Sequence, residues 1–432
     1  MGESKLGAGM PRRDFLKATA TVTAATMAGG LLSSGVWSQG DDKIRMALIG
    51  CGGRGCGAAA NAAMSAENVE LYVMADLFQD HMDDKFPAMK EALGEQFNVT
   101  PDRCFVGFDA YQQALATDAN YVLLTTPPGF RAQHLRAAVE AGKHVFMEKP
   151  VAVCPTGVRH VIESGELAKQ KGVGIVAGTQ YRHHPCFLDL VKRVHDGQIG
   201  RITAAQSYYN TGTLWKHDRQ EAWTDLEWQI RNWLYFTWLA GDHIVEQAIH
   251  HIDTTNWFLN AYPTECVAMG GRQVRTDPAY GHIYDHFSVD FTYPDGVKVT
   301  HMCRQMDNCE GRLGEVIIGT DGVCDGMGGT ITGKNAYTSP EKPGFQGIGA
   351  AYVREHGALI ESIRAGAPIN EAEQVANTCL TGIMARMAAY TGKRVTWDFV
   401  KNESKLNLMK DVTEFGPMPV DEVAMPGRTP LV

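Results

Sequence analysis

Lys149 lies at a position in the sequence where a charged side chain requires a partner or a function. The tripeptide Glu148-Lys149-Pro150 follows an apolar run, residues 144–147, that reads as a buried strand. A charged pair at the end of such a strand costs free energy unless the charges are paired or used. An ammonium group there can hydrogen-bond a reacting hydroxyl and stabilise the negative charge that develops on its oxygen. We therefore treat Lys149 as a candidate catalytic residue.

A second candidate for acid–base chemistry lies in residues 241–253, which the sequence pattern predicts as one helix. Glu246 and His250 are four residues apart, so they share a face of this helix, and Asp253 continues that face. A carboxylate beside an imidazole can orient it as a general acid or base. This spacing predicts His250 as the base and Glu246 as the residue that orients it.

Two other assignments of these residues stay open. His250 can be a core histidine whose hydrogen bonds are satisfied inside the fold, which is the common case for this residue type. Alternatively, His243, Glu246 and His250 can hold a metal ion, with His183 and His184 as further ligands. We predict that no metal is bound.

A glycine-rich string, Gly50-Cys51-Gly52-Gly53-Arg54-Gly55, follows a predicted strand and opens an alanine-rich helix. A G-x-G-x-x-G dinucleotide site needs this context. The first glycine allows the tight turn, the second lets the backbone approach a pyrophosphate, and the third lets the helix pack on the strand. The helix N-terminus adds free N–H groups. A glycine-rich turn without a ligand is the alternative. The cofactor contacts that we predict in the string are Gly50, Gly52, Gly53, Arg54 and Gly55.

Other candidate cofactor contacts end neighbouring strands. Asp76 ends the second predicted strand, where its carboxylate can accept hydrogen bonds from ribose hydroxyls and repel a 2′-phosphate, so we predict NAD over NADP. Its alternative role is a helix cap, and Arg54 can offset a phosphate. Thr126 and Pro127 end the fourth strand, at the carboxyl edge where open parallel sheets bind ligands. The predicted contacts at the end of the fifth strand are Glu148 and Lys149. Beside a nicotinamide, Lys149 and His250 would then act on the hydroxyl from which hydride leaves.

The order of the predicted elements indicates how these residues are positioned. Apolar strands alternate with helices up to about residue 177, which predicts a parallel Rossmann sheet covered on both faces. Beyond residue 200 the strands are longer and alternate, with a hairpin at Pro294-Asp295-Gly296, which predicts a large open, mostly antiparallel sheet. The fold class is therefore α/β, with a second α+β domain. The predicted segments are 1–40, 43–165 (Rossmann), 166–400 (substrate and assembly) and 401–432 (a surface arm).

Composition limits the class of partner. The 432 residues carry a net charge of −9 without basic blocks after the first 20 residues, which argues against nucleic acid as a partner. The ten cysteines show no zinc-type spacing, and we expect most to be small buried hydrophobes. Six of the eight tryptophans lie between Trp215 and Trp257, where they can line a carbohydrate cleft or pack in a core or interface.

The N-terminal segment predicts export. Arg12-Arg13-Asp14-Phe15-Leu16-Lys17 precedes a mildly apolar stretch that reaches Trp37, which is the layout of a twin-arginine signal. The alternative is a disordered basic tail. We expect the twin-arginine machinery as a partner and the periplasm as the location.

Together, the export signal, the glycine-rich string, Asp76, the Glu-Lys-Pro tripeptide and the E-x-x-x-H-x-x-D segment resemble the Gfo/Idh/MocA oxidoreductase family over about residues 43–395. The exported glucose–fructose oxidoreductase branch is the most similar in layout. The resemblance implies a Rossmann domain, sugar, polyol or cyclitol substrates, and catalytic positions at Lys149 and His250. Many members carry Asp four residues before the catalytic histidine, where this chain has Glu246. The candidate substrate contacts at this edge are Tyr181, Arg182, His183 and Asp253.

These features favour a periplasmic NAD-dependent sugar oxidoreductase that keeps its cofactor bound, because the periplasm has no pool of free NAD. A glycoside hydrolase that works by transient oxidation, elimination and re-reduction is the alternative, and the intact Glu-Lys-Pro tripeptide argues against it. A non-enzymatic sugar-binding protein is the third hypothesis. We expect a homodimer or homotetramer packed through the open sheet.

Overall fold

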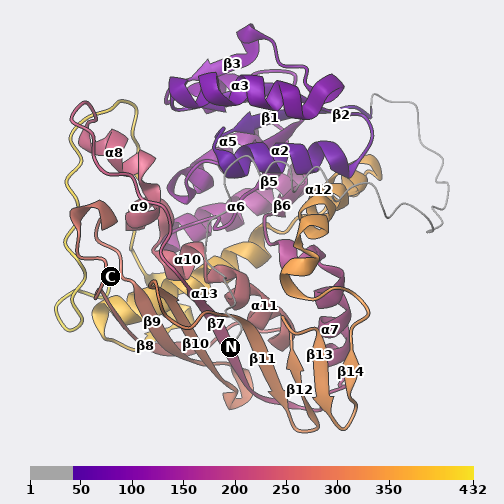
Figure 1. Ribbon diagram of the computed structural model, residues 1–432, viewed down its shortest axis with the longest axis vertical. Helices are drawn as coiled ribbons and strands as arrows, with labels where there is room; N and C mark the ends of the chain where they lie inside the picture. The colour runs from indigo at the N-terminus through magenta and orange to yellow at the C-terminus, as the bar shows by residue number, and fades with distance from the viewer. Residues whose placement is uncertain (1–41) are drawn as a thin grey trace, which may run out of the picture. The chain divides into compact units, whose positions relative to one another are not determined.

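Six parallel strands form the first sheet of the structure, a computed structural model that describes residues 42–432 (Figure 1). The order β3-β2-β1-β4-β5-β6 is that of a Rossmann sheet, which confirms the predicted architecture. The strands are β1 (Ile44–Ile49), β2 (Val69–Asp76), β3 (Cys104–Val106), β4 (Tyr121–Leu124), β5 (His144–Met147) and β6 (Ile175–Ala177). The helices between them are α2 (Gly53–Ser65), α3 (Gln79–Leu93), α4 (Ala110–Leu115), α5 (Arg131–Glu140) and α6 (Pro155–Lys171). The predicted twin-arginine signal lies outside the described residues.

Burial on both faces explains why these strands are continuously apolar. Ala47 and Ile49 of β1 belong to one core cluster, whereas Met46 and Leu48 belong to another, so successive side chains serve opposite faces of the sheet. Since both faces are covered, neither set can be polar. This arrangement leaves only the strand ends for polar chemistry.

Nine strands form the second sheet, in the order β14-β13-β12-β11-β7-β10-β9-β8-β15. All neighbours are antiparallel except β7 and β10, which confirms the predicted mostly antiparallel sheet. The strands are β7 (Ile202–Thr211), β8 (Glu265–Gly271), β9 (His286–Thr292), β10 (Lys298–Gln305), β11 (Arg312–Gly319), β12 (Gly322–Asp325), β13 (Thr330–Gly333), β14 (Tyr337–Thr338) and β15 (Val395–Thr396). Asp295 (φ 59°) and Gly296 (φ 74°) form the predicted turn between β9 and β10.

Helices cover one face of the large sheet and leave apolar side chains on the other. The helix α11 (Ile249–Leu259) packs on β7 and β11, and α13 (Ala372–Thr391) packs on β8. Figure 1 shows both helices between the large sheet and the Rossmann strands. Val267, Met269 and Met302 are 49%, 77% and 41% exposed. Among residues 42–432, none of the helices is long and apolar enough to cross a membrane.

The predicted boundary between residues 165 and 166 falls inside α6, and β6 still belongs to the Rossmann sheet. The helix α12 (Ile348–Arg364) also returns from the second half of the chain to pack on α2 and on the short helix η4 (Gln180–His183). The boundary is therefore wrong, because the last Rossmann strand and one of the helices that cover the sheet come from sequence beyond it.

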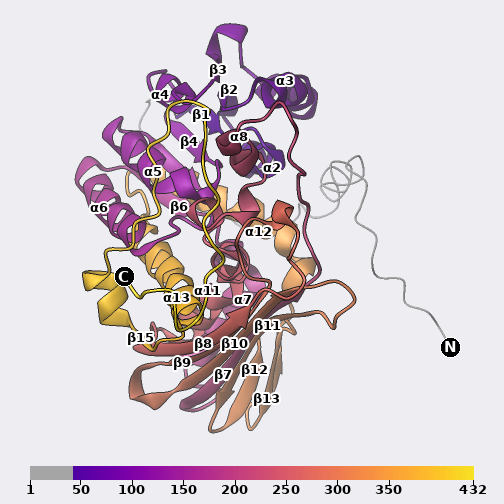
Figure 2. The same cartoon turned by 90° about the vertical axis from the view of Figure 1, so that its left-hand side faces the viewer.

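The segment 212–240 and the C-terminal arm pack together beside the Rossmann sheet. Helices α8 (Asp225–Arg231) and α9 (Thr237–Ala240) supply Trp228 and Trp238 to a third apolar cluster, which also contains Phe78 from the loop after β2. These two tryptophans are core residues, whereas Trp215 is 45% exposed. Figure 2 shows the arm, in yellow, rising past the Rossmann strands next to α8. All ten cysteines are free thiols.

Candidate active site

The glycine-rich turn after β1 has the geometry that a dinucleotide site needs. Gly50 has φ +99°, and a Cβ there would lie 2.7 Å from the backbone nitrogen of Thr126. A Cβ on Gly55 would lie 2.0 Å from the carbonyl oxygen of Gly50. In contrast, a Cβ on Gly52 or Gly53 meets nothing within 4 Å. Gly52 also caps α2 without a side-chain hydrogen bond, so the first N–H groups of the helix face open space. The turn therefore fits a pyrophosphate.

Substitution of the two kinds of glycine should have opposite effects. Gly55→Ala should lower the free energy of unfolding by about 1–3 kcal/mol or more, because the new methyl group collides with backbone. Gly52→Ala should leave the melting temperature close to the wild-type value and weaken nucleotide binding, because its methyl group enters only the open space. Thermal unfolding and nucleotide titration of both variants test this. Equal loss of stability in both would contradict the assigned roles.

Asp76 joins the turn to the loop after β2. Its Oδ2 accepts a hydrogen bond from Cys51 N (2.6 Å) and its Oδ1 accepts one from Phe78 N (2.9 Å). His81 Nδ1 lies 3.2 Å from the same Oδ1, and this contact raises the pKa of His81 above its ordinary value. Phe78, not Asp76, occupies the N-cap of α3, so the helix-cap alternative is not supported. The carboxylate lies at the strand end where a ribose binds in this fold.

The side chains of Arg54 and Glu148 form an ion pair with each other beside the glycine-rich turn. Arg54 Nε donates to Glu148 Oε1 (2.5 Å), and its Nη2 lies 3.4 Å from Glu355 Oε1. The guanidinium also lies 4.5 Å from the ring centroid of Tyr352 on α12. Direct cofactor contacts by both residues were predicted from sequence, and this stays a prediction. In the structure each side chain pairs with the charge of the other.

Thr126 and Pro127 follow β4 at the carboxyl edge and are partly exposed. The Thr126 hydroxyl lies 3.2 Å from His134 Nδ1. The backbone of Thr126 borders the glycine-rich turn, since a Cβ on Gly50 would lie 2.7 Å from the Thr126 nitrogen. This is the edge of the sheet at which both residues were predicted.

Lys149 reaches from the end of β5 to the segment before α11. Its Nζ donates to the carbonyl oxygen of Glu246 (2.5 Å) and to Glu246 Oε1 (2.7 Å). The side chains of Lys149 and Glu246 are only 13% and 9% exposed. An ammonium group has three N–H donors, so these two bonds leave one donor for a ligand.

The predicted helix 241–253 is interrupted after Glu246, the residue whose carbonyl oxygen accepts a hydrogen bond from Lys149. The structure has α10 (His243–Glu246) and then α11, with Gln247 and Ala248 between them. In a continuous helix His250 N would bond to Glu246 O. It bonds to Gln247 O (3.3 Å) instead, while Lys149 occupies the carbonyl of Glu246. The prediction that Glu246 orients His250 is therefore wrong, because its carboxylate is directed to Lys149.

His250 lies in an aromatic and cationic environment. Its ring centroid is 6.4 Å from that of Tyr209, at an interplanar angle of 26°, and 6.0 Å from that of Tyr181, edge to face. Burial lowers the pKa of His250 well below its ordinary value, and the positive charges of Lys149, His251 and Arg54 lower it further. The imidazole is therefore neutral at physiological pH and able to accept a proton.

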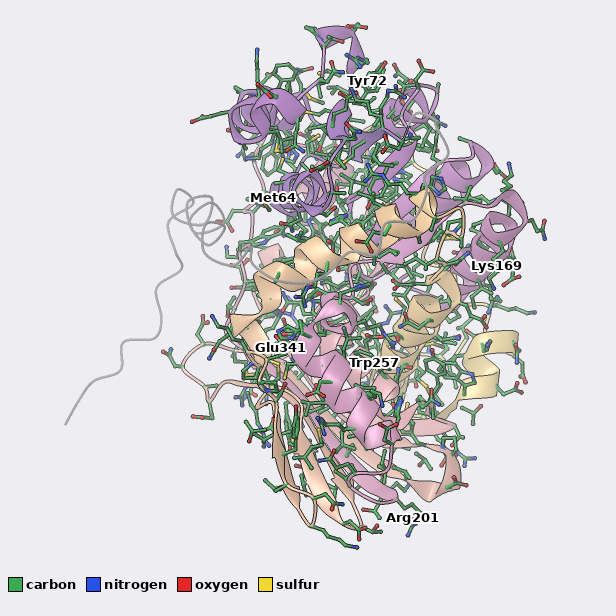
Figure 3. The ribbon with its side chains drawn as sticks, turned by 90° about the vertical axis from the view of Figure 1, so that its right-hand side faces the viewer. Met64, Tyr72, Lys169, Arg201, Trp257 and Glu341 are labelled. Carbon is green, nitrogen blue, oxygen red and sulfur yellow. The ribbon has the colours of Figure 1, made fainter. Side chains whose placement is uncertain are left out.

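The predicted substrate contacts have other partners. Arg182 donates from Nε to Asp253 Oδ2 (2.8 Å) and from Nη2 to Oδ1 (3.0 Å), and its guanidinium lies 5.0 Å from the ring centroid of Trp257. Tyr181 is 3% exposed and packs against His250. Figure 3 places Trp257 between the Rossmann domain, marked by Tyr72, and the large sheet, marked by Arg201. In the structure, Arg182 and Asp253 are thus paired with each other and Tyr181 packs against His250, and their contact with substrate stays a prediction.

His183 lies at the same edge, with Nε2 3.5 Å from Glu371 Oε1. Within residues 42–432 there is no group of three or more His, Cys, Asp or Glu side chains placed to hold a metal ion. His243, one of the ligands in the metal alternative, is buried with its ring centroid 5.1 Å from that of Phe287.

Three residues at the site were missed from sequence. Tyr209 lies near the end of β7, in the large sheet, and no motif marks it. Tyr352 and Glu355 lie on α12, about 200 residues beyond Lys149 in the sequence, and no motif marks them. Burial raises the pKa of Glu355 well above its ordinary value. Only the packing of α12 on α2 brings these two side chains to Arg54.

Comparison with known proteins agrees with this geometry. Scyllo-inositol 2-dehydrogenase (NADP(+)) of Bacillus subtilis (strain 168) is 32% identical over 133 residues, which are 30% of this chain and 34% of that protein. The 1,5-anhydro-D-fructose reductase of Ensifer adhaerens is 25% identical over 240 residues, 52% of this chain and 64% of that protein. The matches therefore span less than two thirds of either relative.

A solved structure of scyllo-inositol dehydrogenase from Lactobacillus casei, with bound NAD(H) and scyllo-inositol, has the same fold. Its TM-score is 0.62 at 19% identity, and the match covers 82% of this chain and 99% of that one. A model of the oxidoreductase family with an NAD-binding Rossmann fold matches residues 44–179, and a model of the GFO/IDH/MocA C-terminal domain matches residues 187–324. With both characteristic domains in order, this chain belongs to the Gfo/Idh/MocA family of oxidoreductases.

Proposed function

We propose that this protein transfers hydride between a tightly held nicotinamide cofactor and a hydroxyl-bearing carbon of a sugar, polyol or cyclitol. One observation carries the proposal. Lys149, at the end of β5, donates to the carbonyl oxygen and the carboxylate of Glu246, so its ammonium group lies at the segment that leads into α11 and His250. This contact is at the sheet edge that also carries the glycine-rich turn. A neutral base and a cation at one hydroxyl are what alcohol oxidation requires.

The residues at the site have separate roles in this reaction. His250 accepts the hydroxyl proton, and in the reverse direction donates it. Lys149 uses its remaining N–H to hold the same oxygen and stabilise its negative charge, while Glu246 fixes the lysine side chain. Tyr209 and Tyr181 fix the ring of His250. The cofactor, when bound at the glycine-rich turn, supplies the hydride acceptor or donor.

The proposed cofactor is NAD rather than NADP. Asp76 supports this preference, because a carboxylate at the end of β2 repels a 2′-phosphate. The position of His81 beside Asp76 gives the preference a pH dependence, since protonated His81 partly cancels that repulsion.

The lowered pKa of His250 predicts the pH profile of the oxidation. Only the neutral imidazole accepts a proton, and a lowered pKa keeps it neutral to lower pH. The single-turnover rate should therefore stay constant as the pH falls through about 6.5, the ordinary value for histidine, and decline only below that. A rate that halves near pH 6.5 would show that the base titrates at the ordinary histidine value and that the pKa of His250 is not lowered in solution.

The proposal is tested with the protein as purified, without added nucleotide. Mixing with inositols, sugars and glycosides, and following the absorbance of reduced nicotinamide, should give a rise stoichiometric with protein for one group of substrates. Extracted nucleotide is measured in parallel. Protein that carries NAD and releases the aglycone of a glycoside would favour the hydrolase alternative. Protein that binds a sugar but no nucleotide would favour the sugar-binding alternative.

We also propose export to the periplasm and assembly through the open sheet face. The R-R-x-F-L-K string supports the first, and the exposed Val267, Met269 and Met302 support the second. Cell fractionation, with both arginines replaced by lysine as the control, measures export. Light scattering of the purified protein measures its mass in solution.

A further inference from the structure

The loops after β2 and β3 carry an aromatic surface that the proposed chemistry does not use. In a Rossmann site the pyrophosphate lies at the turn after β1 and the ribose at the end of β2, so the adenine lies further toward β3. In this chain the loop residues there are Phe78 and Phe108. Phe78 is 6% exposed and Phe108 is half-buried.

A residue from the far end of the chain covers these two rings. The Phe415 ring stacks on Phe78 at a centroid distance of 5.8 Å and an interplanar angle of 10°. It also meets Phe108 edge to face at 4.9 Å. Phe415 itself is 37% exposed, so one part of the ring contacts the loops and the remainder is accessible.

The arm that carries Phe415 is held by α8. Leu226 N donates to Gly416 O (3.1 Å), Gln229 Nε2 donates to Met418 O (2.7 Å), and Met418 N donates to Asp225 Oδ2 (3.3 Å). These bonds hold the stretch directly after Phe415, at Gly416 and Met418. Residues 405–432 contain no helix or strand.

The helix α8 is in turn fixed to the Rossmann domain. Arg231 donates from Nη1 and Nη2 to the two carboxylate oxygens of Asp80 (3.0 and 3.1 Å). Its guanidinium lies 3.8 Å from the ring centroid of Phe78. The arm, α8 and the loop after β2 thus contact one another, and Figure 2 shows the arm beside α8.

We propose that the C-terminal arm, through Phe415, forms a wall of the adenosine site and slows the release of the dinucleotide. This inference rests on the proposed function, because it assumes that NAD binds at the glycine-rich turn and Asp76. The ligand chemistry is that of an adenine ring, whose π face stacks on aromatic side chains whatever its substituents. The glycine-rich turn, Asp76 and the loops after β2 and β3 all come from residues 50–108, so the arm would connect the last 30 residues to cofactor retention.

The test compares dissociation of labelled NAD from loaded full-length protein after a chase with unlabelled NAD. Since removal of one stacking side chain costs about 1–3 kcal/mol per base, Phe415→Ala should release NAD roughly 5- to 150-fold faster. Phe415→Trp should keep the slow rate. Phe345→Ala removes another exposed phenyl ring, 54% exposed, from the short 3₁₀ helix η8 (Gly344–Gln346) before α12 and should also keep the slow rate. Melting temperatures of all variants check that each is folded.

A second measurement separates the two ends of the dinucleotide. Phe415→Ala should weaken the binding of AMP and leave that of nicotinamide mononucleotide unchanged. If wild type and Phe415→Ala bind NAD but release it at the same rate, the arm is not part of the site and the proposed function stands. If the wild type binds no nucleotide, the proposed function and this inference are both wrong.

Discussion

His250→Ala should reduce the single-turnover rate of substrate oxidation by about 10²- to 10⁴-fold, the usual contribution of a positioned general base. The reason is that His250 is the neutral proton acceptor at the site, held neutral by burial and by the charge of Lys149. Nucleotide affinity should stay within about twofold of wild type, since the ring lies on α11 and outside the glycine-rich turn. Stopped-flow absorbance of reduced nicotinamide measures the rate.

The matched control for this variant is His195→Ala. His195 is an exposed histidine at the end of α7 (Pro185–His195), and its Nε2 lies 2.9 Å from the carbonyl oxygen of Trp257. Its loss should leave the rate unchanged. A His250→Ala protein that turns over at a near-normal rate would rule out His250 as the base, whatever the control does.

Lys149→Met should have an even broader effect, on both rate and stability. Loss of the donor at the reacting oxygen should lower the rate by about 10²- to 10³-fold. The substitution also leaves Glu246, 9% exposed, as a buried carboxylate without its cation, which typically costs about 3–5 kcal/mol. Urea unfolding measures the stability and single-turnover kinetics the rate.

The double variant Lys149→Met, Glu246→Gln separates these two effects. Removing the unpaired carboxylate should recover much of the lost stability, because a buried pair is costly mainly when only one partner remains. The rate should stay low. The surface pair Lys192 and Asp196, 75% and 60% exposed, is the control, and Lys192→Met should cost under about 1 kcal/mol. A double variant no more stable than Lys149→Met would show that Glu246 is not held by Lys149 in solution.

Much of this architecture was predictable because its causes are local. Strands of the Rossmann sheet are apolar on both faces, so β1 and β5 are recognisable from short runs. The glycines of the turn are required by contacts with neighbouring backbone, so their spacing is visible. The position of Lys149 at the edge followed from the rule that parallel strands end together.

The errors arise where distant parts of the chain compete for the same group. The segment 241–253 has a helical pattern, but Lys149, nearly 100 residues earlier, occupies a carbonyl that the helix needs. The ion pairs of Arg54 with Glu148 and with Glu355 of α12 were not predicted, because no pattern near Arg54 marks either partner. Asp253 lies on the expected face of its helix, and its carboxylate accepts hydrogen bonds from Arg182. Periodicity describes which face a residue occupies and not which partner it finds there.

The bond from Lys149 to Glu246 also has a consequence for motion. Lys149 belongs to the Rossmann sheet, whereas Glu246 belongs to the helices that line the large sheet. Between the same two parts of the chain, Arg182, in η4 directly after β6, pairs with Asp253 of α11. A hinge opening between them would separate two ion pairs at once and expose buried charges, at a cost of several kcal/mol. We therefore expect the catalytic centre to stay closed through repeated turnovers, so that small substrates exchange without a swing of the two halves.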